Sequence, residues 1–168
     1  NLYLEDWSNG MIHSPQYVFD MMDALSCGPI RRFMIPDTLG ILNPDNTYAF
    51  CCEMIRRYPD VRFDFHAHND YDLAVANVMA AVKAGVHGIH TTINGLGERA
   101  GNAPLSSVIA VLNDQIKTPN GVVERRINHV SRVVETYTGV HIPANKPVVG
   151  ENVFTQCAGI HADGDNKD

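Results

Sequence analysis

The stretch Asp64-Phe65-His66-Ala67-His68-Asn69-Asp70 decides how the chain is interpreted. Successive side chains of a β-strand point to opposite faces, so Asp64, His66 and His68 are expected on one face of a strand. Two imidazoles on one face can bind a single divalent cation through neutral ring nitrogens. Alternatively, both histidines are partly buried polar residues at a strand end. The pair by itself does not choose between a metal site and polar packing.

An apolar strand followed by a loop and an amphipathic helix occurs four times along the chain. The helices are expected where apolar residues recur at helical spacing after a capping residue or a proline. The expected strands are residues 2–7, 32–36, 61–67 and 88–93. The expected helix starts are Ser14 with Pro15, Asn43 with Pro44, Asp70 or Asp72, and Asn102 with Pro104, and the expected stops are Gly28 and Gly85.

Repeated strand–helix units predict parallel strands covered by helices, in either a doubly wound sheet or a (β/α)8 barrel. Polar side chains follow the strands at their carboxyl ends, which is typical of barrel enzymes. We therefore predict an α/β fold in which the chain forms the C-terminal half of a (β/α)8 TIM barrel and the start of the following linker region. The remaining strands are expected before residue 1, since the chain opens on Asn1 rather than Met.

The sequence pattern changes after Asn113, where the strand–helix repeat ends. Residues 1–122 are predicted to be the half-barrel with its four units, and residues 123–168 a helix and linker segment leading out of it. The helix is expected over residues 123–137, where apolar side chains recur at helical spacing. The chain ends in a polar run without a closing element, so we expect it to be part of a longer protein.

Composition excludes several classes of function. The chain has 168 residues, 45% of them hydrophobic, and a net charge of −6, which suits a soluble globular domain. An acidic balance argues against nucleic-acid and membrane-surface partners, and no signal or membrane-spanning pattern is found. The cysteines lack metal or disulfide spacing, so we expect reduced packing residues in a cytoplasmic protein. They are Cys27, Cys51, Cys52 and Cys157.

Other polar residues are candidates with structural alternatives. In the glycine-rich loop 95–102, Asn102 is expected to cap the next helix, and its side-chain oxygen remains available for a second role. Glu5 is expected on a strand face with Tyr3 and Trp7, as a general acid or base or as a carboxylate paired within the barrel. Thr38 could bind a substrate carboxylate or cap a loop. By itself, His161 is more often a solvent-exposed histidine, and His87 and His90 are expected to be packing or polar-core histidines.

The segments 66–70 (HAHND) and 95–102 (GLGERAGN) together resemble motifs of a known enzyme family. The chain is similar to the isopropylmalate, homocitrate and citramalate synthases, metal-dependent (β/α)8 enzymes that condense acetyl-CoA with a 2-oxo acid. Residues 3–10, 36–40 and 159–164 extend the resemblance over nearly the whole chain. These stretches are most similar to the citramalate synthases of that family.

The resemblance implies a metal site. His66 and His68 match the metal-binding histidines of the family, and Asn102 matches the asparagine that completes or borders that site. The implied cofactor is a divalent ion (Zn²⁺, Mn²⁺ or Mg²⁺), and acetyl-CoA is the implied co-substrate. The ion would polarise the ketone and carboxylate oxygens of the 2-oxo acid as a Lewis acid.

The resemblance also implies the residues that handle the substrates. Thr38 matches the threonine that holds the 2-oxo acid carboxylate, and Glu5 matches a carboxylate beside substrate and metal. His161 matches a linker histidine implicated in proton transfer. Together with Glu5 it would deprotonate the methyl group of acetyl-CoA, and the thioester would be hydrolysed after the condensation. The products would be 2-isopropylmalate or citramalate, in leucine or isoleucine biosynthesis, from 2-oxoisovalerate or pyruvate.

The chain also departs from the family pattern. The Arg-Asp-Gly motif of the family's first strand, the pocket residues that select the 2-oxo acid and the C-terminal regulatory domain are all absent from it. Asp72 stands where the family usually has glycine, and it could cap the following helix. A homodimer is expected from the family, with small-molecule substrates and neither nucleic acid nor membrane as partner.

Three alternatives remain open from the sequence. The first is homocitrate synthase, which differs in the 2-oxo acid. The second is a carbon–carbon lyase of the hydroxymethylglutaryl-CoA type, which carries a catalytic cysteine in the loop where residues 95–102 have none. The third is a catalytically silent paralogue that binds metal.

Overall fold

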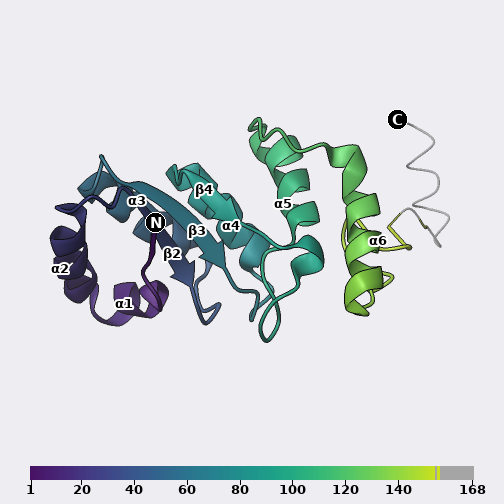
Figure 1. Ribbon diagram of the computed structural model, residues 1–168, viewed down its shortest axis with the longest axis horizontal. Helices are drawn as coiled ribbons and strands as arrows, with labels where there is room; N and C mark the ends of the chain where they lie inside the picture. The colour runs from purple at the N-terminus through teal and green to yellow at the C-terminus, as the bar shows by residue number, and fades with distance from the viewer. Residues whose placement is uncertain (154, 156–168) are drawn as a thin grey trace. The chain divides into compact units, whose positions relative to one another are not determined.

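The first 122 residues form a parallel sheet covered by helices on one side. The computed structural model describes residues 1–153 and 155, which fall into two compact units divided between Val122 and Val123. In the first unit, four parallel strands pair in the order β1-β2-β3-β4. They are β1 (Leu2–Tyr3), β2 (Arg32–Asp37), β3 (Arg62–Ala67) and β4 (Gly88–His90) (Figure 1).

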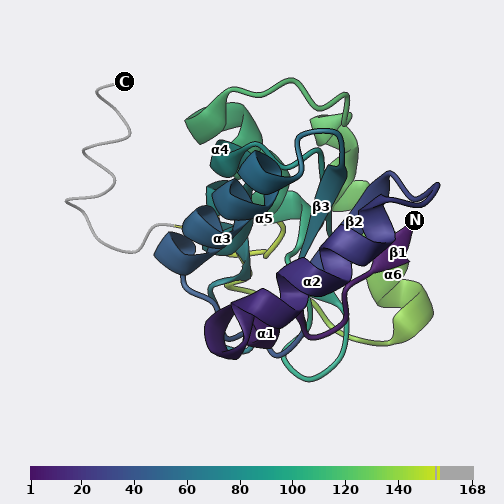
Figure 2. The ribbon, with the colours of Figure 1, turned by 90° about the vertical axis from the view of Figure 1, so that its left-hand side faces the viewer.

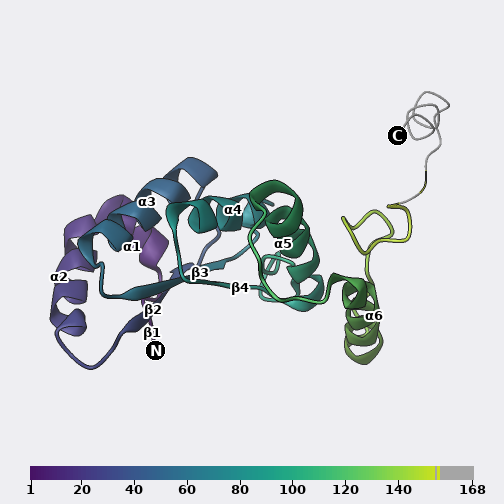
Figure 3. The ribbon, with the colours of Figure 1, turned by 90° about the horizontal axis from the view of Figure 1, so that it is seen from above.

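Each strand is followed by helical structure. The helices of this unit are α1 (Trp7–His13), α2 (Pro15–Ser26), α3 (Pro44–Arg57), α4 (Ala74–Ala84) and α5 (Leu105–Val111), with the short turns η1 (Ile93–Gly95) and η2 (Leu112–Ile116). Figures 2 and 3 both show α2, α3 and α4 on one side of the strands. The predicted alternation of strands and helices in a parallel α/β fold is therefore confirmed.

The core lies between the strands and these helices. Every second residue of β2 and β3 faces the helices and is fully buried: Phe33 and Ile35 on β2, and Phe63, Phe65 and Ala67 on β3. The residues between them point to the other face of the sheet. Burial of one such aromatic side chain contributes about 1.5–3 kcal/mol, so this layer supplies much of the stabilisation of the sheet. The apolar face thus fixes which side chains point to the other face.

The opposite face of the sheet carries the polar side chains of β3 and β4. Met34, Asp64 and Gly88 are in register on β2, β3 and β4, and His66 is in register with His90 one layer further along. Parallel strands place their carboxyl ends at one edge, so the loops after β2, β3 and β4 meet there. The expectation that Asp64, His66 and His68 share one face rests on this alternation.

Local signals set several helix boundaries as predicted. The side chain of Asn43 accepts a hydrogen bond of 2.8 Å from the Asn46 N–H and caps α3, with Pro44 at the first helical position. Pro15 likewise opens α2, although the Ser14 side chain makes no capping hydrogen bond. Gly85 ends α4 in the left-handed region at φ 100°, which favours glycine.

The first strand is shorter than predicted, and Trp7 does not lie on it. β1 ends at Tyr3, and Asp6 turns the chain with a left-handed φ of 58°. Trp7 then begins α1, is buried, and meets Phe50 edge-on at 6.3 Å between ring centroids. Glu5 is exposed in the turn, so the predicted face shared with Tyr3 and Trp7 was wrong. The alternating pattern of side chains in the sequence does not show where the backbone turns and the strand ends.

Two other predicted boundaries were also wrong. β4 ends at His90 rather than residue 93, because the chain turns into η1. α4 begins at Ala74, and Asp72 does not cap it: Asp72 takes a left-handed φ of 59°, while the Ala74 N–H donates to Asn69 Oδ1. The glycine usual at Asp72 in the family matches this backbone conformation.

The second unit contains η3 (Glu124–Arg126) and α6 (Ile127–Thr138). Glu135 of α6 binds Arg132 at 2.9 Å and accepts from the Ile142 N–H at 2.7 Å. Those two contacts, the backbone N–H foremost, lower the pKa of Glu135 below its usual range. That this unit leads out of a barrel stays a prediction.

Cys51 is buried and packs as expected, whereas Cys27 is exposed, so the expectation of a packing residue was wrong there; Cys157 lies outside the described residues. Cys51 and Cys52 lie in α3, and they and Cys27 are free thiols; burial raises the pKa of the Cys51 thiol well above its usual range. In the part of the chain that the structure describes, no helix is both long and apolar enough to cross a membrane.

Candidate metal and substrate site

His66 and His68 lie together where β3 ends. Their ring centroids are 5.0 Å apart and the rings are nearly perpendicular, at 88°. Burial, and then the neighbouring His68 and His90, lower the pKa of His66 to about 4, against a smaller opposing effect of Glu5. His66 is therefore neutral near pH 7, the form in which an imidazole binds a metal ion.

Asn102 is brought to His68 by the glycine-rich loop. The two residues form an isolated antiparallel bridge, and Asn102 Nδ2 donates to the Leu96 carbonyl at 3.0 Å. This bond leaves Asn102 Oδ1 as the free atom of the amide. Gly97 makes room for it, since a Cβ there would lie 2.0 Å from Asn102 Nδ2. Asn102 does not cap α5, so that expectation was wrong.

The polar atoms at this point are buried and unpaired. His66 Nδ1, His68 Nδ1 and Asn102 Oδ1 have no hydrogen-bond partner within the described residues. Buried polar groups are normally satisfied, so three unpaired atoms on residues that lie together are compatible with a bound ligand. Two imidazoles and an amide oxygen are also a donor set that divalent ions accept.

The described residues contain no cluster of three or more His, Cys, Asp or Glu side chains arranged for a metal ion. The Asn102 amide, which is of another type, is the further donor next to the two histidines. The donor set is compatible with a metal that has open coordination positions for a substrate.

Thr38 and Glu5 form a hydrogen-bonded pair beside the histidines. The Thr38 hydroxyl donates to Glu5 Oε1 at 2.9 Å and accepts from the Asp6 N–H at 3.0 Å. Because a carboxylate accepts and a backbone N–H donates, both directions follow from the chemistry of the groups. The left-handed turn at Asp6 aims its N–H at Thr38 and places Glu5 against the loop after β2.

Arg99 and Asp70 were not singled out from the sequence as site residues. Arg99 makes two hydrogen bonds to the Asp70 carboxylate, at 2.7 and 3.0 Å, and a third to the Thr38 carbonyl at 2.7 Å. The Arg99 guanidinium lowers the pKa of Asp70. Both residues stand inside the two quoted motifs, but only the folded chain shows them in contact.

Asp37, at the end of β2, was not among the predicted site residues. It is fully buried and its two carboxylate oxygens accept the N–H groups of Ile41 and Leu42, each at 3.0 Å. Its backbone carbonyl accepts the His68 N–H. Asp37 therefore shapes the loop that carries Thr38 and ties it to the end of β3.

The other candidate histidines divide between described and undescribed parts of the chain. His90 packs against His66 with ring centroids 5.6 Å apart, and its Nε2 lies 3.8 Å from Asp64. Asp64 is held by Arg32 at 2.6 Å. His90 thus packs against polar neighbours as expected, with its side chain 30% exposed. His87 is exposed, so the expectation of a packing or polar-core histidine was wrong there. His161 lies outside the described residues.

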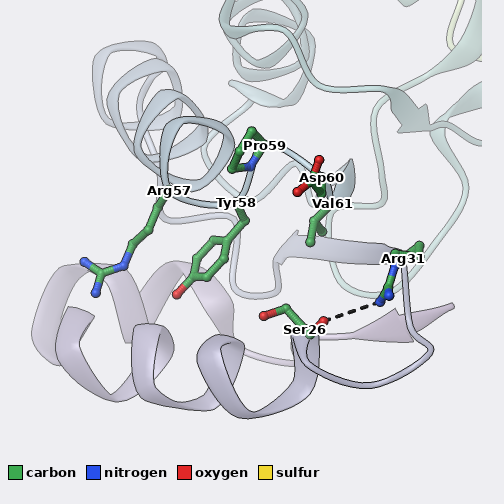
Figure 4. A pocket seen from close by; sticks show the side chains of 7 residues that line it. All are labelled: Ser26, Arg31, Arg57, Tyr58, Pro59, Asp60 and Val61. Atoms are coloured by element: carbon green, nitrogen blue, oxygen red, sulfur yellow. Dashed lines mark hydrogen bonds between the residues drawn. The ribbon is translucent and has the colours of Figure 1, made fainter.

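A second hollow lies at the amino ends of β2 and β3. It is lined by Ser26, Arg31, Arg57, Tyr58, Pro59, Asp60 and Val61. Figure 4 shows Arg31 and Arg57 on opposite sides of it. Arg31 donates to the carbonyls of Ser26, Gly28 and Ile30, and Arg57 lies 4.3 Å over the Phe19 ring. Both cations are therefore engaged by contacts within the fold.

The chain belongs to the HMGL-like family, whose model matches residues 9–134. It is 41% identical over 154 residues to "Putative (R)-citramalate synthase CimA" of Methanopyrus kandleri, covering 91% of this chain and 30% of that protein. It is 41% identical over 150 residues to homocitrate synthase of Sulfolobus acidocaldarius, covering 89% and 32%. A "Probable 2-isopropylmalate synthase" of M. kandleri is 40% identical over 148 residues, covering 88% and 30%. The chain therefore spans about a third of the length of these curated relatives.

Solved structures agree on the fold. The hydroxymethylglutaryl-CoA lyase of Bacillus subtilis superposes with a TM-score of 0.69 at 22% identity, over 77% of this chain and 45% of that one. A lyase solved with coenzyme A and 3-methylmalate gives a TM-score of 0.71 at 21% identity, over 86% and 49%. The predicted TIM-barrel fold is thereby confirmed, with this chain covering part of the barrel.

Proposed function

We propose that this chain is the part of an acetyl-CoA:2-oxo acid condensing enzyme that carries two metal-binding histidines and the carboxylate-binding threonine. The observation that carries the proposal is the group of three buried, unpaired atoms, His66 Nδ1, His68 Nδ1 and Asn102 Oδ1. The names of the relatives, which are citramalate, homocitrate and 2-isopropylmalate synthases, support the same reaction class.

His66, His68 and Asn102 would hold a divalent ion: Zn²⁺, Mn²⁺ or Mg²⁺. When bound, the ion supplies Lewis-acid polarisation of the ketone and carboxylate oxygens of the 2-oxo acid. The neutral state of His66 supports this role, because an imidazole must be unprotonated to bind a metal.

Thr38 would bind the 2-oxo acid carboxylate and Glu5 would take part in removing a methyl proton from acetyl-CoA. The Thr38 hydroxyl has one proton, and in this structure that proton is donated in a hydrogen bond to Glu5 Oε1. A substrate carboxylate at Thr38 competes for that proton, and an oxygen of Glu5 is then released for proton transfer. We propose His161 as the partner of Glu5 in that transfer.

The 2-oxo acid is proposed to be pyruvate or 2-oxoisovalerate, with a biosynthetic role in isoleucine or leucine formation. A homodimer in the cytoplasm is proposed with it, and acetyl-CoA and the 2-oxo acid as its small-molecule partners. A lyase reaction is disfavoured because the loop 95–102 has no cysteine.

The test is acetyl-CoA-dependent release of free thiol by the full-length protein. Pyruvate, 2-oxoisovalerate and 2-oxoglutarate are each assayed with and without a chelator. Chelator-sensitive release with one acid supports the proposal and identifies the substrate. A folded, metal-loaded protein that releases thiol with none of the three refutes it, and cleavage of hydroxymethylglutaryl-CoA would then establish the lyase.

A further inference from the structure

Arg99 connects the loops that follow three different strands. It belongs to the loop between β4 and α5, and it binds Asp70, which follows β3, and the carbonyl of Thr38, which follows β2. Both partners precede Arg99 in the sequence, Asp70 by 29 residues and Thr38 by 61. A planar guanidinium suits this geometry because it can donate to two partners at fixed angles.

The surrounding backbone is shaped to admit this contact. Gly40 has a φ of +61°, and a Cβ there would lie 2.6 Å from Asp70 Oδ2 and 2.9 Å from the Asp70 nitrogen. Arg99 itself has a φ of 51°, a conformation that non-glycine residues seldom adopt. Such outliers persist where surrounding contacts hold them, and they gather at functional sites.

The Arg99–Asp70 pair differs from the ion pair on the surface of α3. Arg56 and Glu53 are three residues apart on one helix, and the Arg56 side chain is 72% exposed. The Arg99 side chain is 39% exposed and that of Asp70 24%. The first pair joins neighbours that the helix already holds together, whereas the second adds a side-chain contact between loops that follow different strands.

The metal-binding histidines are held by other means. His66 is fixed in the β3 ladder, in register with Pro36 and His90. Asn102 is held to the end of β3 by its bridge with His68 and by the Asn69 N–H bond to Gly101 O at 2.9 Å. Loss of the Arg99 guanidinium would therefore loosen the loop of Thr38 more than the histidines.

We propose that Arg99 is a positioning residue that holds the Thr38 loop in place against the end of β3 by binding Asp70 and the Thr38 carbonyl at once. The inference rests on the proposed function, because it takes Thr38 as the group that binds the 2-oxo acid. Arg99 acts through Thr38, so its removal is expected to weaken the apparent affinity for the 2-oxo acid.

The test uses the full-length protein and its Arg99→Gln, Arg99→Lys and Asp70→Asn variants, with Arg56→Gln as the matched control. Arg99→Gln should raise KM for the 2-oxo acid about 10- to 100-fold, since small misplacements at a reacting centre cost up to about 10²-fold. The kcat, the KM for acetyl-CoA and the Kd for Zn²⁺ by chelator competition should stay within about threefold. Arg99→Lys should restore part of the loss, and Arg56→Gln should change none of these constants.

Asp70→Asn should also raise KM for the 2-oxo acid. The double variant Arg99→Gln with Asp70→Asn should have a KM no higher than that of the more damaged single variant, because both substitutions break the same contact. An unchanged KM for the 2-oxo acid in folded Arg99→Gln and Arg99→Lys overturns the inference. The inference is also overturned if Zn²⁺ affinity falls, both KM values rise by the same factor and Tm is lower, because that outcome indicates a structural role only. Wild-type protein that condenses no 2-oxo acid refutes the proposed function and this inference with it.

Discussion

The two ends of the parallel strands are both polar, yet they differ in how their polar atoms are satisfied. At the amino ends, Arg31 donates to backbone carbonyls and Arg57 covers the Phe19 ring. At the carboxyl ends, His66, His68 and Asn102 keep buried atoms without partners in the described chain. Buried atoms without a partner also occur elsewhere, for example Trp7 Nε1, Asn77 Oδ1 and Ser106 Oγ. The carboxyl ends are distinguished because two imidazoles and an amide on neighbouring residues are unsatisfied together.

The largest expected effect is at the carboxyl ends. His68→Ala in the full-length protein should lower kcat/KM about 10³-fold, since Lewis-acid stabilisation is worth several kcal/mol, and should weaken Zn²⁺ binding in parallel. His87→Ala is the control: His87 is exposed just before β4 and accepts the Phe63 N–H at 3.3 Å. Equal loss of Zn²⁺ binding in both variants would remove the distinction between the two ends.

The next effect concerns the hydroxyl of Thr38. Thr38→Val keeps the shape but removes the group that binds Glu5 and the Asp6 N–H. A hydrogen bond to a charged group contributes about 1.5–3 kcal/mol, so KM for the 2-oxo acid should rise about 10- to 100-fold. Thr38→Ser should stay near wild type. Steady-state kinetics on both variants checks this, and a normal KM in Thr38→Val would exclude the threonine as a substrate ligand.

At the amino ends, substitutions should change stability and leave catalysis alone. The Tyr58 hydroxyl has two acceptors within hydrogen-bond distance for its one proton, Asp23 Oδ1 at 2.7 Å and the Phe19 carbonyl at 3.1 Å. Tyr58→Phe should lower the free energy of unfolding by about 1 kcal/mol with kcat/KM unchanged. Urea titration and the thiol assay measure the two quantities, and a large loss of activity at full stability would place a function at this end.

The same residue gives a pH test. Burial, and then Asp23, raise the pKa of Tyr58 from 10.0 to about 12. A group whose pKa is raised on folding contributes its full stability below the unfolded value and loses it as pH rises through the folded value. The stability difference between wild type and Tyr58→Phe should therefore shrink between pH 10 and about pH 12. A constant difference across that range would contradict the assignment.

The smallest effect is expected at Asp72. Its left-handed φ of 59° costs little for glycine, while its carboxylate accepts a 3.1 Å hydrogen bond from Asn69. Asp72→Gly should therefore change the free energy of unfolding by only about 0.5 kcal/mol, and Asp72→Ala should lower it by about 1 kcal/mol. Thermal unfolding of both variants checks the order, and equal stabilities would mean that the backbone conformation is not strained.

Much of the fold followed from local sequence. Phe63, Phe65 and Ala67 alternate with His66 and His68, so the core face and the site face of β3 were both predictable. Trp7 shows where this reasoning fails: the pattern continued, but the left-handed turn at Asp6 had already ended the strand. A turn depends on contacts such as the hydrogen bond from the Asp6 N–H to the Thr38 hydroxyl, and these two residues are far apart in the sequence.

The sequence by itself determined the strand–helix repeat, the placement of His66 on β3 with His68 just beyond its end, and the likeness to a family of condensing enzymes. Only the tertiary structure decided that Asn102 pairs with His68 and keeps its side-chain oxygen unpaired instead of capping α5. Only the tertiary structure decided that the Thr38 hydroxyl donates a hydrogen bond to Glu5. It also decided that Arg99 joins Asp70 to the Thr38 loop. The physical reason is that alternation and capping are short-range properties, whereas these contacts form only when the parallel sheet brings the carboxyl ends of its strands to one edge.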